Sequence, residues 1–200
     1  NMGSYDYNAN NVVGLRMVDC RMNHLTDRTR WGVIGSNFCK NILLENCELS
    51  RMDTHMGVSG RYDIRGCTLG HMGLNAIGRG HLTIEDSTLY GSALVAFRRD
   101  YGSTWEGDLH IRNSRWIPAC GDPIWPHLIN VSNDGTHDFG YPCSMPHSIE
   151  IDGLYIDDRN HPADYTGPYI FTNPAGTDSQ PVAQPHPYTP CRTLSVRNVQ

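Results

Sequence analysis

Two stretches of the chain, residues 51–79 and 97–101, carry acidic, basic and imidazole side chains that could act together in catalysis. Asp53 and His55 lie two residues apart, the spacing that places strand side chains on one face. In such a pair the carboxylate orients the imidazole, which can then take up a proton. The residues that we expect to act in catalysis are Asp53, His55, His71, Arg99, Asp100 and Tyr101.

Other side chains near these stretches suit the binding of a sugar polymer. Guanidinium groups pair with carboxylate or sulfate groups, and aromatic rings offer flat apolar surfaces. We expect an apolar platform from Ile77 and Phe97, with Tyr101 and Trp105 at its rim. The expected substrate-binding residues are Arg51, Asn75, Arg79, Phe97, Arg98 and Trp105. An acidic or complex polysaccharide is therefore the predicted ligand.

Two reactions on such a polymer fit these residues. Hydrolysis requires two carboxyl groups, about 5–5.5 Å apart for retention of configuration and about 6.5–9.5 Å apart for inversion; Asp53 and Asp100 are the acids near the patch. β-Elimination requires a cation that neutralises the uronate and a base that removes its α-proton. The candidates are Arg98 or Arg99 as the cation and His55, His71 or Tyr101 as the base. The arginine and histidine character favours a lyase over a hydrolase.

A repeated phrase supplies the elements that must position these residues. It reads apolar-x-apolar-x-(Asn/Asp/Gly)-(Cys/Ser)-x-apolar, and variations on it begin at Leu15, Ile42, Tyr62, Leu82, Leu109, Ile149 and Leu194. Its Asn/Asp/Gly markers, 27, 20, 20, 27, 40 and 45 residues apart, are Asp19, Asn46, Gly66, Asp86, Asn113, Gly153 and Asn198. Strand-like alternation at a period near twenty predicts a parallel β-solenoid. Each marker predicts a sharp bend, because these residue types tolerate left-handed backbone geometry.

Alignment of the phrases predicts which residues stack. The residue before each marker alternates in charge after the first copy, in the order Val18, Glu45, Arg65, Glu85, Arg112, Asp152 and Arg197. Stacked about 4.8 Å apart, these residues form favourable cross-strand pairs. The residue after the marker predicts an inward stack of Cys20, Cys47, Cys67, Ser87 and Ser114. A gap-free twenty-residue alignment also stacks Thr54 on Leu74 and Leu94, which leaves Asp53 and His55 on the outer face.

The repeated phrase resembles that of the right-handed parallel β-helix proteins of the pectate-lyase-like superfamily, over residues 12–117 well and over residues 118–200 weakly. Residues 50–58 and 100–108 are also similar to β-helix segments of phage tail, tailspike and cell-surface proteins. The resemblance implies an all-β, right-handed, single-stranded parallel β-helix whose outer sheet carries the substrate groove. It also implies an extracellular, cell-surface or virion location, and a homotrimer if the protein is tailspike-like.

Composition sets the remaining bounds. Two hundred residues make one domain, and a net charge of −5 argues against a general nucleic-acid binder. No apolar run reaches the roughly 18 residues of a membrane span. Of the seven cysteines, Cys120, Cys143 and Cys191 lie in loop-rich sequence and are the candidates for one disulfide. No cysteine or histidine spacing indicates a zinc site, so we expect no metal and no cofactor.

The two parts of the chain differ in regularity. All twelve prolines fall at or after Pro118, and proline cannot donate to a central strand ladder. We therefore expect regular coils over residues 1–117 and coils with long proline-rich excursions over residues 118–200, within one domain. The sequence ends inside a repeat, so we also expect a fragment of a longer chain.

The sequence leaves three functions open. The first is a polysaccharide depolymerase, a lyase rather than a hydrolase, in a phage tail or secreted surface protein. The alternative is a non-catalytic receptor-binding or structural β-helix, because one fold hosts many unrelated functions. The third is oligomerisation through the proline-rich segments, with no ligand.

Overall fold

A computed structural model of the chain describes residues 7–22, 25, 33–34, 37–70, 73–98, 100, 102–118, 126–131, 144–159, 161–171 and 189–200. Across these ranges the regular elements are β-strands, and every pairing between them is parallel. The described part of the chain contains no helix with the length and apolar character needed to cross a membrane. The all-β, parallel class predicted from the repeat is confirmed.

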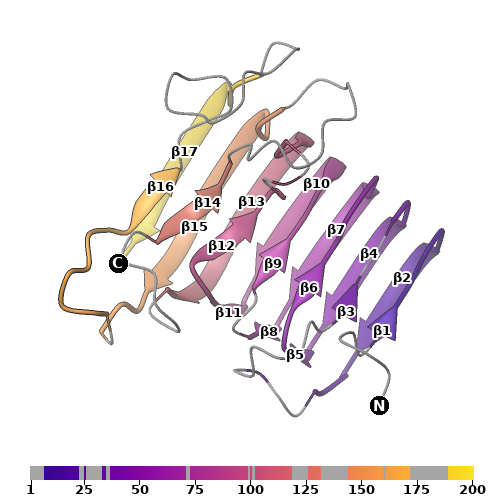
Figure 1. Cartoon of the computed structure of the whole chain (residues 1–200), viewed down its shortest axis with the longest axis horizontal. Coiled ribbons are helices and arrows are strands. Elements are labelled where there is room, and N and C mark those ends of the chain that lie inside the picture. Colours follow the sequence, from indigo (N-terminus) through magenta and orange to yellow (C-terminus); the bar gives the residue numbers. More distant parts are fainter. Residues whose placement is uncertain are drawn as a thin grey trace.

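The strands form two sheets (Figure 1). Sheet A has seven strands, β1 (Tyr7–Asn8), β3 (Val33–Ile34), β6 (Met52–Asp53), β9 (Leu74–Asn75), β12 (Ala93–Ala96), β14 (His127–Asn130) and β16 (Tyr169–Phe171). Sheet B has ten, β2 (Val13–Val18), β4 (Lys40–Glu45), β5 (Glu48–Leu49), β7 (Ser59–Arg65), β8 (Thr68–Leu69), β10 (Gly78–Glu85), β11 (Thr88–Tyr90), β13 (Trp105–Ile117), β15 (Ser148–Ile156) and β17 (Thr193–Val199).

The chain passes alternately through the two sheets. In each turn a sheet A strand is followed by a longer sheet B strand, and the next turn pairs alongside it. Figure 1 shows the result as a row of strands that runs from the N-terminal to the C-terminal part of the chain, curled like half of a barrel. Most of the proline-rich sequence lies outside the described residues, as do Cys120 and Cys143. The division at residue 118 therefore stays a prediction.

All seven markers of the repeat adopt the predicted bend. Their φ angles are positive, between 44° at Asn113 and 78° at Gly153. The pairing register then places each residue before a marker beside its equivalent in the next turn, as in Glu45 beside Arg65 and Arg65 beside Glu85. The alternating column of charges is confirmed, and its most exposed side chains lie on the outer face of sheet B.

The small residues after the markers form the predicted inward stack. The backbone N–H of Cys67 donates to Ser87 Oγ at 3.1 Å, and that of Ser87 donates to Ser114 Oγ at 3.3 Å. Ser87 Oγ in turn donates to the carbonyl of Glu85 at 2.7 Å. Burial raises the pKa of the Cys67 thiol to about 11. The stack therefore satisfies the backbone N–H groups at the bends with side chains that stay uncharged.

Glycine fixes the corner where the chain leaves sheet A and enters the long strands of sheet B. A Cβ atom at Gly80, where φ is 119°, would lie 2.0 Å from the carbonyl oxygen of Gly60. A Cβ atom at Gly107 would lie 1.9 Å from the carbonyl oxygen of Gly80. Only glycine fits such a close backbone approach. Three successive turns therefore share one corner geometry.

Candidate functional site

The register of sheet A differs from the gap-free alignment. Met52 pairs with Leu74 and Asp53 with Asn75, an offset of 22 residues (75 − 53). Asn75 then pairs with Ala96, an offset of 21 residues (96 − 75). The predicted stacking of Thr54 on Leu74 is therefore wrong.

The difference arises in the connections between the two sheets. Leu49 pairs with Leu69 at the predicted offset of 20 residues (69 − 49). Met52 comes three positions after Leu49 (52 − 49), but Leu74 comes five positions after Leu69 (74 − 69). The second turn therefore contains two extra residues before it enters sheet A.

Asp53 is the centre of the candidate site, and its side chain is fully buried. Its Oδ2 atom lies 2.9 Å from His55 Nε2 and 3.0 Å from Arg51 Nη2, while Oδ1 accepts a hydrogen bond from Arg98 Nη1 at 2.8 Å. The neighbouring Met52 belongs to the hydrophobic core, and alternation along the strand places Asp53 on the other face. The carboxylate is therefore covered by its cationic partners and is not part of the shallow exposed surface that we expected.

Arg98 joins the two carboxylates of the site. Its Nε atom donates to Asp100 Oδ1 at 2.9 Å, and its Nη2 atom donates to Asp100 Oδ2. Its backbone has a φ of 47°, which is uncommon outside glycine, and its carbonyl accepts from the N–H of Ser103 at 3.1 Å. Asn75 belongs to the same network. With its amide oriented so that the oxygen points to Arg51, that oxygen accepts a hydrogen bond from Arg51 Nε at 3.0 Å. The site thus brings together Arg51, Asp53, His55, Asn75, Arg98 and Asp100.

The electrostatics keep this network charged. Burial raises the pKa of Asp53, but the hydrogen bond from His55 and the charges of Arg51 and Arg98 outweigh it, so the net pKa lies below its ordinary value. Burial lowers the pKa of Arg98, but its bonds to Asp100 and Asp53 outweigh burial, so the net pKa of Arg98 lies above its ordinary value. A general acid needs a raised pKa, so Asp53 does not suit that role. A His55 ring that donates from Nε2 to Asp53 carries its lone pair on Nδ1, which is the form a base requires.

Two predicted aromatic contacts are wrong. Phe97 and Trp105 are fully buried, and their rings stack in the core with centroids 6.1 Å apart. For Phe97 the physical reason is the 21-residue offset, because a one-residue change of register moves side chains to the opposite face of a sheet. Ala96 takes the place beside Asn75, and Phe97 turns inward. Trp105 instead begins β13 of sheet B, in register with Gly78, and its ring belongs to the core. His71, Arg99 and Tyr101 lie outside the described residues.

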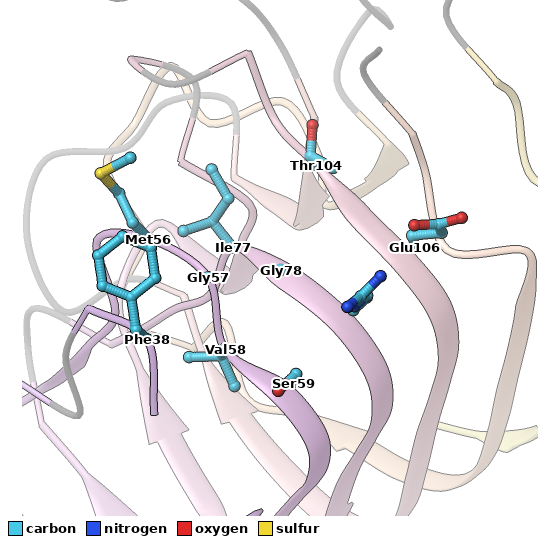
Figure 2. A pocket seen from close by; sticks show the side chains of 10 residues that line it. Phe38, Met56, Gly57, Val58, Ser59, Ile77, Gly78, Thr104 and Glu106 are labelled. Carbon is cyan, nitrogen blue, oxygen red and sulfur yellow. The ribbon is translucent and has the colours of Figure 1, made fainter. Parts of the chain in front are cut away.

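A groove of about 410 Å³ lies next to this network along the chain (Figure 2). We call it the corner groove; its lining residues are Phe38, Met56, Gly57, Val58, Ser59, Ile77, Gly78, Arg79, Thr104 and Glu106. Met56 follows His55 directly, and the N–H of Ile77 donates to Thr54 Oγ1 at 3.2 Å. The groove is therefore continuous in the chain with the network, and it bonds to Thr54, which lies between the network residues Asp53 and His55.

The corner groove has an apolar side and a polar side. Figure 2 shows Phe38, Met56 and Ile77 together on one side, with Glu106 on the other. The Phe38 ring lies against the backbone of Gly57, where a Cβ atom would lie 2.8 Å from ring carbon Cδ1 of Phe38. Phe38 itself is 58% exposed. Arg79 pairs in register with Glu106 on the next strand. The groove therefore offers one exposed ring and two opposite charges to a ligand.

Of the predicted binding residues, Arg79 lines this groove; Phe38 and Glu106 were missed. Phe38 has a φ of 61° and reaches the groove from outside the stretches that carry the acids and histidines, so no spacing rule finds it. Glu106 lies within residues 100–108, between the buried Trp105 and the corner Gly107. Alternation around Trp105 would have pointed to it. The described residues contain no cluster of three His, Cys, Asp or Glu arranged to hold a metal ion.

Comparison with known proteins gives one informative similarity. The chain is 30% identical over 112 residues to a depolymerase specific for the KL64 capsule from Klebsiella phage P510. The matched region covers 47% of this chain and 11% of that protein, so the chain spans about a tenth of its relative. No family model matches the sequence, and no solved structure matches it.

Proposed function

We propose that this chain is part of a right-handed parallel β-helix of the pectate-lyase-like type that binds a polysaccharide in the corner groove. The observation that carries the proposal is the groove itself, whose lining combines the exposed Phe38 ring with the charged residues Arg79 and Glu106. Such a combination suits a sugar, whose C–H faces pack on a ring while its hydroxyl groups bond to charged groups. The similarity to a capsule depolymerase supports the same ligand class.

For the reaction, we propose β-elimination on a uronate-containing polymer. The base removes the proton α to the carboxylate, a carbon–carbon double bond forms, and the glycosidic oxygen leaves. His55 is the proposed base, oriented by Asp53, and Arg79 on the groove supplies the cation for the uronate. Two observations argue against hydrolysis through Asp53 and Asp100: the depressed pKa of Asp53 keeps it from acting as the acid, and its full burial keeps it from reaching the substrate as base or nucleophile.

The alternative is a receptor-binding β-helix without catalysis. The closure of the network favours it, because Arg51, Arg98 and Asp53 neutralise one another and Asp53 has no exposed surface. In either case we place the protein on a virion or outside the cell, in keeping with the phage relative. The homotrimer stays a prediction from the resemblance.

A panel of uronic-acid and neutral capsular polysaccharides tests these proposals. A lyase produces an unsaturated uronate, seen as new ultraviolet absorbance, and a hydrolase produces only new reducing ends. We expect Phe38→Ala to weaken binding at least about tenfold, a loss of about 1.4 kcal/mol. Tyr7→Ala is the control, because Tyr7 is a similarly exposed aromatic residue that does not line the groove.

The outcomes separate the two functions. Binding together with an unsaturated product that His55→Gln abolishes supports the lyase. Binding without any product supports the receptor-binding alternative. Binding that Phe38→Ala and Tyr7→Ala affect equally, or no binding to any polymer of the panel, overturns the corner groove as the site.

A further inference from the structure

We propose a second sugar site, for a neutral sugar unit, in a hollow beside Gly153. The hollow has a volume of about 440 Å³ and shares no lining residue with the corner groove. We call it the bend hollow; its lining residues are Asp86, Ser87, Thr88, Asn113, Ser114, Arg115, Gly153, Leu154, Tyr155, Asn198 and Gln200. It lies along the bends of the repeat, so it draws on residues that the corner groove does not use.

A missing side chain shapes the bend hollow. The register places Arg112, Asp152 and Arg197 in one column, so the next residues, Asn113, Gly153 and Asn198, follow one another at the bends of successive turns. Asn113 and Asn198 carry amides there, and Gly153 carries nothing. A Cβ atom at Gly153 would lie 2.8 Å from Asn113 Oδ1. The Asn113 amide therefore occupies the space that a side chain at position 153 would take, and it forms part of the lining of the hollow.

One exposed ring and one guanidinium group line the bend hollow together with Gly153. Tyr155 is exposed, and the Arg115 guanidinium carbon lies 5.6 Å from the centroid of its ring. Asp157 binds Arg115 Nη2 and also Arg159, whose Nε and Nη2 atoms each donate at 2.7 Å. The hydrogen bonds from Arg159 and Arg115 lower the pKa of Asp157 well below its usual range. Asp157 therefore stays ionised and holds Arg115 against Tyr155 before any ligand arrives.

The chemistry of the lining selects a neutral sugar. The amides of Asn113 and Asn198 and the hydroxyl of Thr88 both donate and accept, as sugar hydroxyl groups require. Arg115 is already engaged by Asp157, and the other charged side chain of the lining, Asp86, offsets its charge and would repel a uronate. An aromatic face, amides and no surplus positive charge fit an uncharged sugar ring packed on Tyr155.

A second site changes how a long polymer would bind. Both sites lie on one stack of paired strands, because β10 and β13 contribute to the corner groove and β13 and β15 to the bend hollow. Two weak sites on a rigid support bind a polymer that reaches both more tightly than either site alone. This inference does not depend on the corner groove, since either site can fail while the other binds.

Gly153→Asn tests the bend hollow. Asparagine already adopts a left-handed bend at Asn46, Asn113 and Asn198, with φ between 44° and 52°. Its Cβ atom at position 153 would have to displace the Asn113 amide, which lines the hollow. Gly66→Asn is the matched control, because Gly66 has a φ of 59°, a Cβ atom there would lie 2.7 Å from Asn46 Oδ1, and neither Gly66 nor Asn46 lines the hollow. The probes are neutral hexasaccharides of glucose, galactose and mannose, with binding followed by ligand-observed NMR.

We expect the native sequence to bind at least one neutral hexasaccharide. Gly153→Asn should weaken that binding at least about tenfold, and Gly66→Asn less than about twofold. Tyr155→Ala should weaken binding of the hexasaccharide as Gly153→Asn does. If Gly153→Asn lowers the melting temperature, the binding of Tyr155→Ala decides whether the bend hollow is a sugar site. Equal binding by all variants, or no binding of any neutral hexasaccharide, overturns the second site. Phe38→Ala, measured with the same probes, shows separately whether the corner groove contributes.

Discussion

Two aspartates with nearly the same bonds, both of them buried, have arginine partners that differ in exposure. In sheet B, Asp63 lies 3.2 Å from Arg61 Nη2 and 3.1 Å from Arg65 Nη2, and these arginine side chains are 67% and 43% exposed. In sheet A, Asp53 lies 3.0 Å from Arg51 Nη2 and 2.8 Å from Arg98 Nη1, and these side chains are 7% and 12% exposed.

The comparison teaches that distance alone does not rank ion pairs. Water screens the charges around Asp63, and such pairs contribute little to stability. Around Asp53 the same charges have lost most of their water, so each one depends on its partners. In the network of sheet A, removing one group takes a charged partner from its buried neighbours, whereas the outer face of sheet B tolerates single changes.

The largest expected effect comes from truncating the two aspartates. Asp53→Ala should lower the free energy of unfolding by about 3–5 kcal/mol, because it leaves the buried Arg51 and Arg98 without their shared carboxylate. Asp63→Ala, the matched change in sheet B, should cost less than about 1 kcal/mol. Urea denaturation of both variants measures the difference. Equal losses would show that the two surroundings do not differ in the way described.

Acid should sharpen the same contrast. The pKa of folded Asp53 lies below its ordinary value of 3.8, so its contribution to stability is complete above that value and is lost as pH falls through the lower, folded pKa. The difference in unfolding free energy between the native sequence and Asp53→Asn should therefore be constant near neutral pH and shrink below about pH 4. Urea denaturation over this range measures it, and a difference that does not change with pH would contradict the depressed pKa.

The smallest expected effect concerns the alternating column of sheet B. Glu85→Arg places like charges beside Arg65 and Arg112, its partners in register, and should cost about 0.5–1 kcal/mol. Added salt should reduce this cost, because these groups are exposed to solvent. Glu85→Gln, which removes the attraction without adding repulsion, should cost less. Denaturation at low and high salt checks the prediction, and a salt-independent loss would indicate damage to packing instead.

The sequence was sufficient to predict the bends of the repeat and the register between the sheet B strands that precede them. Residue type at each marker, such as Asn113 or Asp86, reports directly on backbone conformation. The equal spacing from Asn46 to Gly66 and from Gly66 to Asp86 then carries the register from turn to turn. Bends, charge column and Cys/Ser stack follow from these two facts.

The candidate site was harder to predict because it lies between the phrases. The connections there differ by two residues before Leu74, and the 21-residue offset from Asn75 to Ala96 exchanges the faces of the residues that follow. The predicted grouping of Asp53 with His55 is present in the structure, because residues two positions apart in a strand lie on one face whatever the register of the neighbouring turns. The predicted placement of Phe97 is wrong, since it depends on the register of distant turns.

The glycine corner separates the shape of the corner groove from its chemistry. Backbone contacts at Gly80 and Gly107 leave no room for a side chain, so the path of the chain at the corner is fixed by residues that contribute no functional group. Ser59, Arg79 and Glu106, each one position before a corner glycine, carry the groups that face the groove. A change of specificity can therefore be made, in evolution or in the laboratory, by exchanging these three side chains while the scaffold that presents them stays the same.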